Sequence, residues 1–159
     1  MELEREKDRK INFKPGQYME WTLAHGASDS RGVRRFFTIA SSPTEKDLRI
    51  GVKFYPEPSS FKNYLLAMPV DEEIIATSRA GDFTLPKDDK QEIVLIAGGI
   101  GITPFRSMIK YLLDKKEKRL LNFIRGGCLS DSDTKEFTKD ELAKKESVFF
   151  VVPADKCKK

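Results

Sequence analysis

The sequence predicts a β-rich amino-terminal half followed by an α/β carboxy-terminal half. Up to about residue 87, short segments of alternating polarity are separated by turns rich in Gly, Ser, Asp and Pro. Beyond residue 90, a continuous apolar run passes through a glycine-rich turn into apolar residues at helical spacing. A strand, a glycine turn and a helix, in this order, are typical of a parallel sheet.

Length and composition set the outer bounds. The chain has 159 residues, 39% hydrophobic and 34% charged, which is enough for one ordinary domain or two small ones. Cys128 and Cys157 are far apart, which suits a reducing compartment and argues against an iron–sulfur or zinc site. The only histidine, His25, has no pattern of metal ligands around it, so we expect no metal.

Targeting and partner signals are few. No segment approaches the ~18 apolar residues of a membrane span, and there is no signal-peptide pattern. We therefore expect a cytoplasmic protein without a membrane segment. No motif predicts nucleic-acid binding, and the net charge of +4 favours an acidic partner protein.

The first half contains four expected strands joined by polar connections. Residues 24–33, rich in Gly, Ser and Asp, are expected to form a long hairpin loop, and a Ser-Ser-Pro turn ends the second strand. The strands themselves are recognised by alternating or apolar, β-branched and aromatic residues. They are expected over residues 18–23, 34–39, 48–55 and 72–78.

The second of these strands carries candidate ligand-binding residues. Arg35, Phe37 and Ile39 share one face because side chains alternate along a strand. Arg35 can reach a phosphate, Phe37 can lie flat on an aromatic ring system, and Thr38 can offer its hydroxyl and N–H at the ring edge. The alternative is an ordinary exposed arginine beside core aromatics.

A short helix is expected after Pro58. Ser59 and Ser60 are N-cap residues, and the apolar residues that follow recur at helical spacing. The N–H groups at its start can hold a phosphate, or the two serines can simply cap the helix. Lys53, on the preceding strand, either assists at the phosphate or is solvated.

The third expected feature is the glycine turn after residues 93–97, a run typical of a central strand buried on both faces. The turn contains Gly98, Gly99 and Gly101, and Thr103 is expected to be the N-cap of the next helix, with Pro104 in its first position. Glycines let a ligand approach the backbone, so a pyrophosphate fits here. The alternative is a tight turn without a ligand.

Two further strands are expected in the carboxy-terminal half. Residues 120–124 form a credible second strand, and Arg125 at its end either contacts a ligand phosphate or is a solvated charge. Residues 148–152 are expected to be the third strand of the same doubly wound parallel sheet.

Taken in order, these motifs resemble those of the ferredoxin–NADP reductase superfamily, over roughly residues 13–125. Two departures are Phe37 in place of the usual Tyr, and Met68-Pro69-Val70-Asp71-Glu72 in place of a Pro-Gly-Asp turn. The matching segments are Pro15-Gly16-Gln17-Tyr18, Arg35-Phe36-Phe37-Thr38, Pro58-Ser59-Ser60-Phe61, Gly81-Asp82-Phe83 and residues 98–104.

The resemblance implies a β barrel plus an α/β unit, both abbreviated. An antiparallel flavin-binding barrel would occupy residues 1–87, and a partial, Rossmann-like NAD(P)-binding domain with a short doubly wound parallel sheet would occupy residues 88–159. The binding residues it implies are Arg35, Ser59 and Ser60 for the flavin phosphate, Phe37 and Thr38 for the ring, and Gly98, Gly99, Gly101 and Thr103 for the dinucleotide.

The implied function is that of a flavin-dependent oxidoreductase. Such an enzyme transfers electrons between NAD(P)H and an acceptor, such as a ferredoxin or flavodoxin-like protein, through bound FAD; the motif also permits FMN. The cofactor performs this chemistry, so no catalytic side chain is expected. One alternative is a flavin-binding electron-relay module without independent NAD(P)H activity, completed by a partner chain or a homodimer. The other is a chain that folds but has lost its cofactors.

Overall fold

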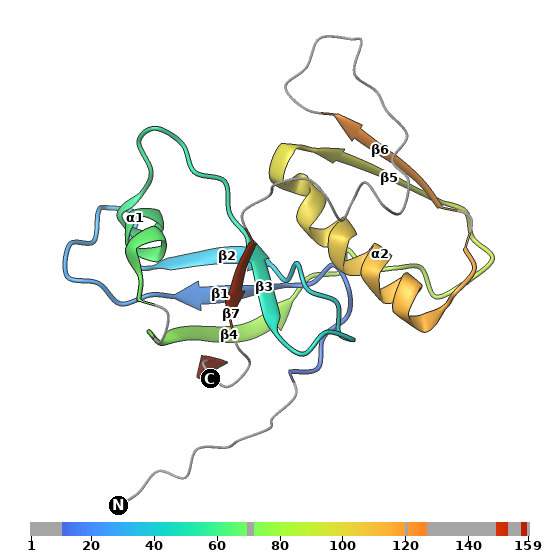
Figure 1. Cartoon of the computed structure of the whole chain (residues 1–159), viewed down its shortest axis with the longest axis horizontal. Coiled ribbons are helices and arrows are strands. Elements are labelled where there is room, and N and C mark those ends of the chain that lie inside the picture. The colour runs from blue at the N-terminus through green and yellow to red at the C-terminus, as the bar shows by residue number, and fades with distance from the viewer. Residues whose placement is uncertain (1–10, 70–71, 120, 127–148, 153–156, 159) are drawn as a thin grey trace, which may run out of the picture.

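The structure, a computed structural model, describes residues 11–69, 72–119, 121–126, 149–152 and 157–158 (Figure 1). Strands β1–β4 and helix α1 lie on one side of the molecule, and β5, β6 and α2 lie on the other. The first group comprises β1 (Tyr18–Thr22), β2 (Arg34–Thr38), β3 (Leu48–Gly51), α1 (Ser60–Ala67) and β4 (Ile74–Ala80).

The strands of the first group are antiparallel. β1 is central and pairs with β2 on one side and β4 on the other, with an irregularity in the β4 pairing between Tyr18 and Glu20. An antiparallel bridge between Ile39 and Ile50 connects the end of β2 to β3. All four strands were expected from the sequence, and the bounds of each lie within four residues of the predicted ones.

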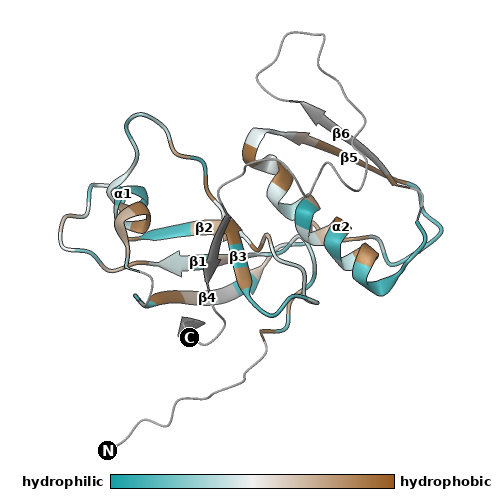
Figure 2. Cartoon of the chain, in the orientation of Figure 1, coloured by the Kyte–Doolittle hydropathy of each residue, from teal (hydrophilic) through white to brown (hydrophobic). Residues whose placement is uncertain are grey.

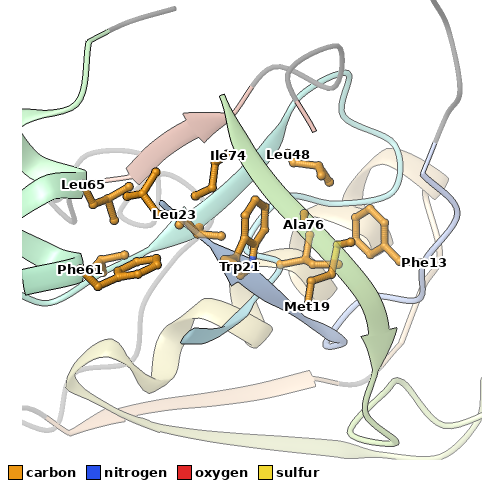
Figure 3. Packing of buried hydrophobic residues seen from close by; sticks show 12 residues of the cluster. Phe13, Met19, Trp21, Leu23, Leu48, Phe61, Leu65, Ile74 and Ala76 are labelled. Carbon is orange, nitrogen blue, oxygen red and sulfur yellow. The ribbon is translucent and has the colours of Figure 1, made fainter. Parts of the chain in front are cut away.

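The core of the first group is built by alternation along β1. Met19, Trp21 and Leu23 point inward, and Trp21 is completely buried. Figure 3 shows Trp21 at the centre of this cluster, between residues of β4 and of α1. From α1 come Phe61 and Leu65, as the helical spacing predicted, so α1 is held by one apolar face.

Two glycines make the close contacts at the barrel end. Gly16 and Gly81 have positive φ values of 99° and 108°, which favour glycine. A Cβ on Gly16 would lie 2.0 Å from the Phe83 carbonyl oxygen, and the Gln17 side chain donates to the Gly81 carbonyl. The Pro-Gly-Gln and Gly-x-Phe segments, far apart in sequence, therefore meet in space.

The second group follows the predicted strand, glycine turn and helix. It comprises β5 (Ile93–Gly98), the 3-10 helix η1 (Gly99–Ile102), α2 (Thr103–Lys115) and β6 (Leu121–Gly126). β5 and β6 are parallel and in register from Ile93↔Leu121 to Gly98↔Gly126. The parallel pairing predicted for these two segments is confirmed.

Helix α2 covers one face of β5. Ile93, Leu95 and Ala97 pack with Phe105 and Met108 of α2 in a second apolar cluster, separate from the barrel core. Figure 2 shows the hydrophobic and hydrophilic bands that alternate along α2 as this packing requires. Side chains on the other face of β5 are exposed, Val94 by 55% and Ile96 by 69%. Burial of this strand on both faces was predicted, and it holds for one face only.

The last strands pair differently from the prediction. β7 (Phe149–Val152) is antiparallel to β3, and β8 (Cys157–Lys158) is parallel to β4. Residues 148–152 were expected in the parallel sheet with β5 and β6, and that placement is wrong. An apolar run predicts a strand but does not specify its partner, and any strand with a free hydrogen-bonding edge can accept it.

Two apolar clusters fit two structural units, and the boundary near Lys87 stays a prediction. Within the described ranges, no helix combines the length and apolar character needed to cross a bilayer.

Candidate functional site

The two faces of β2 serve two different parts of the candidate site. Arg35 and Phe37 both contact Phe61 of α1: the Arg35 guanidinium lies 5.4 Å from the Phe61 ring centroid, and the Phe37 ring lies 5.9 Å from it. The predicted common face of Arg35 and Phe37 is confirmed. Phe36 and Thr38 project from the opposite face, because side chains alternate along the strand.

The Arg35 guanidinium folds back onto the backbone of the turn that precedes β2. Its Nη1 donates to the carbonyl oxygens of Arg31, Gly32 and Arg34, at 2.8, 3.1 and 2.5 Å. Its Nη2 is buried and makes no hydrogen bond in the structure, although an Asp29 carboxylate oxygen lies 4.0 Å away. A preoriented arginine with a spare buried donor is suited to bind an anion.

The start of α1 lies beside Arg35. Ser59 is the N-cap, as predicted, and its hydroxyl accepts from the Lys62 N–H at 3.3 Å. Ser60 is the first helical residue, and its N–H donates to the Asp29 carboxylate at 2.9 Å. We call Arg31, Arg35 and the Ser60 N–H the anion site, because Asp29 is the anion that they hold in this structure.

Electrostatics at the anion site favour negative charge. Hydrogen bonds from the Arg31 side chain, and then from the Ser60 N–H, lower the pKa of Asp29 far below its usual range. Burial lowers the pKa of Lys62, and the charges of Arg35 and Arg31 lower it further. The arginines thus add to the effect of burial in disfavouring a further positive charge at this place.

An open hollow lies on the opposite face of β2. It has a volume of about 370 Å³ and is lined by Tyr18, Phe36 and Thr38. The Tyr18 and Phe36 rings meet edge to face with centroids 5.8 Å apart, and Phe36 is 65% exposed. The hollow therefore offers aromatic surface and one hydroxyl, a combination suited to a planar, mostly apolar ligand.

The glycine turn, residues 98–101, precedes α2 and is open to solvent. Gly99 has a φ of 50°, and a Cβ built on Gly99 or Gly101 would meet no atom within 4 Å. This turn therefore leaves room for a ligand next to the backbone, as the sequence predicted. A helix start without acidic residues in its first turn also favours a phosphate.

The predicted capping role of Thr103 is wrong. Ile102 is the N-cap of α2, and Thr103 already has helical φ and ψ of −55° and −47°. Its hydroxyl donates backward to the Ile100 carbonyl at 3.2 Å, because η1 runs directly into α2. Pro104 nevertheless lies in the first helical turn, where its missing N–H costs no intrahelical bond.

An arginine clamp joins α2 to the turn that follows β2. The two Arg106 nitrogens donate to the two Glu45 carboxylate oxygens at 2.7 and 2.9 Å, and Nη1 also donates to the Ala40 carbonyl at 2.8 Å. Beside it, the fully buried Ser107 hydroxyl donates to the Ser41 carbonyl at 2.6 Å. The clamp links the strand of the anion site to the helix that follows the glycine turn.

Burial raises the pKa of Glu45, but the opposing hydrogen bonds from Arg106 and the Ser42 N–H prevail, so its pKa lies below the usual value. The carboxylate is thus ionised at neutral pH, and the pair is bidentate and mostly buried.

The structure groups the predicted binding residues in three places. Arg35 and Ser60 meet at the anion site, with Ser59 capping the same helix; Thr38 lies in the hollow; the glycine turn is separate and is joined to them by the clamp. Phe37 packs on Phe61, and Phe36 presents the exposed ring. The Arg125 side chain lies outside the described residues, and Lys53 has its ammonium 5.2 Å from the Tyr55 ring centroid.

Sequence reasoning did not find Asp29, Phe36, Glu45 or Arg106. Asp29 stands in a polar loop and meets Ser60 across 31 positions, and Glu45 meets Arg106 across 61. No local pattern signals either pair. In the described part of the chain, no three His, Cys, Asp or Glu residues are grouped so that they could hold a metal ion.

Comparison with known proteins agrees with this arrangement. The model of the family described as "Oxidoreductase NAD-binding domain" matches residues 95–156, which begin in β5. A flavohemoprotein of Halalkalibacterium halodurans is 32% identical over 119 residues, covering 71% of this chain and 29% of the relative. A glycine betaine monooxygenase reductase subunit of Chromohalobacter salexigens is 31% identical over 114 residues, covering 70% and 30%.

Solved structures share the fold. The cytochrome P450 reductase GcoB of Amycolatopsis matches with a TM-score of 0.60 at 26% identity, over 78% of this chain and 38% of the other. The ferredoxin–NADP+ reductase of Plasmodium falciparum matches with a TM-score of 0.63 at 20% identity, over 84% and 52%. The chain spans about a third of the length of the curated relatives it matches.

A barrel of antiparallel strands followed by a strand, glycine turn and helix defines the two-part fold of the FAD/NAD(P)-binding oxidoreductases. The predicted fold class is confirmed. Within this class, the chain belongs to the ferredoxin–NADP reductase superfamily.

Proposed function

We propose that the protein is a flavin-dependent NAD(P)H oxidoreductase with FAD as its cofactor. The observation that carries the proposal is the anion site, where Arg35 and the Ser60 N–H converge from β2 and α1. A guanidinium with a free buried donor, beside a helix start, fits a phosphate group of a flavin nucleotide.

The ring of the flavin would bind at the carboxyl end of β2. Thr38 would offer its hydroxyl at the ring edge, as its place in the hollow supports. Phe37 remains our candidate for ring stacking by superfamily resemblance, although it lies on the face of β2 opposite Thr38. Phe36, exposed on the same face as Thr38, is a second candidate from the structure. FAD is favoured over FMN because solved structures that share this fold include a flavohem-like FAD/NAD-binding domain and a flavohemoglobin with bound FAD.

NAD(P)H would bind at the glycine turn. Gly98, Gly99 and Gly101 expose backbone to the dinucleotide, and Thr103 keeps its buried hydroxyl bonded to Ile100, which shapes the turn. When bound, the flavin would supply the redox chemistry that links NAD(P)H to an electron acceptor. The residues of this chain bind and orient the two partners, and the Arg106–Glu45 clamp holds their two binding elements together.

The acceptor proposed is a small acidic redox protein, such as a ferredoxin or flavodoxin-like protein, in the cytoplasm. The net charge of +4 supports electrostatic steering of such a partner. Among the relatives, one is a monooxygenase reductase subunit and another a cytochrome P450 reductase, so a partner protein as acceptor has parallels. A homodimer is a further proposal for the complete assembly.

The visible spectrum of the purified protein, supplied with FAD and then with anaerobic NADH or NADPH, tests the function. Flavin bands that comigrate with the protein and bleach on adding the nucleotide are expected. Bands that bind but do not bleach would favour the electron-relay module over the reductase. Absence of bound flavin would contradict both functions, and the comparison of NADH with NADPH identifies the donor.

A further inference from the structure

The anion site is not left open in this structure, because an internal carboxylate holds it. Asp29 lies in the loop before β2, and its Oδ2 accepts from the Ser60 N–H at 2.9 Å. In return, the Asp29 N–H donates to the Ser60 hydroxyl at 2.9 Å. The loop and the start of α1 are thus bound by a reciprocal pair of hydrogen bonds.

Arginines complete the surroundings of this carboxylate. Arg31 donates its Nε and Nη2 to Oδ2 at 3.1 and 2.7 Å, and its N–H to Oδ1 at 2.9 Å. A helix N–H and a guanidinium are donors that commonly bind a phosphate. Asp29 therefore occupies the Ser60 N–H that the proposed function assigns to the cofactor, together with the neighbouring Arg31.

The carboxylate fills the site incompletely. The buried Nη2 of Arg35 has no hydrogen bond and lies 4.0 Å from Asp29 Oδ1, beyond hydrogen-bond reach. A phosphate has more oxygens, arranged in a tetrahedron, so it can reach a donor that a planar carboxylate leaves free. Two anions cannot share the Ser60 N–H, and their like charges repel.

The Asp29 side chain has the means to withdraw from the anion site. The loop backbone is held near Gly32, whose N–H donates to the Asp29 carbonyl and whose carbonyl accepts from Arg35, so withdrawal requires rotation of the Asp29 side chain and not movement of the loop. The Asp29 side chain is 28% exposed and can rotate toward water without crossing the core. Arg31 is itself exposed and can follow Asp29 or remain at the site.

We propose that Asp29 acts as an internal substitute for the cofactor phosphate: it stabilises the cofactor-free protein and is displaced when the flavin binds. This inference rests on the proposed function. Its consequence is that Asp29 weakens flavin binding while it strengthens the fold without flavin. A residue that only anchored the loop would strengthen both.

The Asp29→Asn variant tests the proposal, because Asn keeps the size and loses the charge. Two quantities are measured: the Tm of the flavin-free protein and the Kd for FAD, from quenching of flavin fluorescence. We expect a lower Tm together with an FAD affinity about tenfold higher than that of the unaltered chain. Asp88→Asn is the matched control, since Asp88 is exposed and only caps the Lys90 N–H in a distant turn.

A parallel loss of Tm and FAD affinity in Asp29→Asn, or an equal gain of affinity in Asp88→Asn, overturns the inference. Inorganic pyrophosphate serves as a second probe of the site, by the rise in Tm that it produces. If neither protein binds FAD but pyrophosphate stabilises Asp29→Asn more than the unaltered chain, the proposed function fails, while competition between Asp29 and a phosphate for the anion site is upheld. If pyrophosphate and FAD both fail to distinguish the two proteins, the inference fails.

Discussion

The starts of α1 and α2 were both expected to bind phosphate, yet they are built in opposite ways. At α1, Ser59 caps the helix, Asp29 occupies the Ser60 N–H, and arginines surround the carboxylate. At α2, no side chain caps the helix, and a Cβ added at Gly99 or Gly101 in the turn before it would meet no atom within 4 Å. The first site holds an internal carboxylate that leaves one buried Arg35 donor unused, and the second is open space beside the backbone.

This difference matches two ways of holding a cofactor. A site with charged donors on two elements can retain a ligand through many turnovers. A site made of exposed backbone at a helix start offers N–H groups to a phosphate, without charged side chains to hold it. We therefore expect the flavin to be resident at α1 and the nicotinamide nucleotide to exchange at α2.

Arg35→Ala should have the largest effect, on the binding of flavin and not on the binding of NAD(P)H. Loss of a preoriented charged donor is expected to weaken FAD binding by about 3 kcal/mol, roughly 100-fold in Kd. Arg34→Ala is the control, because Arg34 is exposed on the same strand. Equal losses in the two variants would show that general charge, not the position of Arg35, attracts the flavin. Fluorescence titration measures both.

Glu45→Gln breaks the clamp that joins the two sites. Removing the charge from a mostly buried bidentate pair should lower stability by about 2 kcal/mol at neutral pH, measured by urea unfolding. Lys110→Gln is the control, since its ion pair with Asp114 lies within α2.

The effect of Glu45→Gln should depend on pH with a definite sign. The folded pKa of Glu45 is lower than its ordinary value of 4.5, so its contribution is complete above pH 4.5 and is lost as the pH falls through the folded pKa. The difference in stability between the two proteins should therefore be constant near neutrality and shrink in acid. A difference that grows in acid would contradict the clamp.

Gly101→Ala tests whether the ligand site at the start of α2 is independent of the anion site at the start of α1. The new methyl group meets no atom of the protein but enters the space beside the backbone, so the fold should stay intact while NAD(P)H binds about tenfold more weakly. Gly26→Ala is the control, because its methyl group also meets nothing and lies in the Asp29 loop. Steady-state KM for NAD(P)H and the Kd for FAD are measured together. A weaker FAD affinity in Gly101→Ala would show that the α1 and α2 sites are coupled, and would contradict their separation.

Ser59→Ala should have the smallest effect, on stability rather than on binding. The buried hydroxyl caps α1, and its loss typically costs about 1 kcal/mol. Thermal unfolding should show the decrease, and Ser59→Thr should restore most of it. An unchanged Tm in Ser59→Ala would mean that the 3.3 Å bond to the Lys62 N–H contributes nothing.

Predictions from the sequence succeeded where the pattern of residues within one helix or strand is enough to specify which side chains are buried. Alternation places Trp21 inside β1, and helical spacing places Phe61 and Leu65 on the buried face of α1. The predictions that failed depended on neighbouring elements that a local pattern does not reveal. Thr103 loses its predicted capping role because a neighbouring 3-10 turn was not foreseen, and β7 pairs with β3 because an apolar run does not name its partner.

The sequence by itself determined the strands, the capped helix α1, the glycine turn and the family to which they belong. Periodicity and capping are local, so a short stretch of chain contains them completely. Only the tertiary structure decided that Asp29 occupies the anion site, that Phe36 lines the hollow, and that Arg106 clamps Glu45. These contacts join residues far apart in sequence, and their energies depend on how separately folded elements are placed against one another.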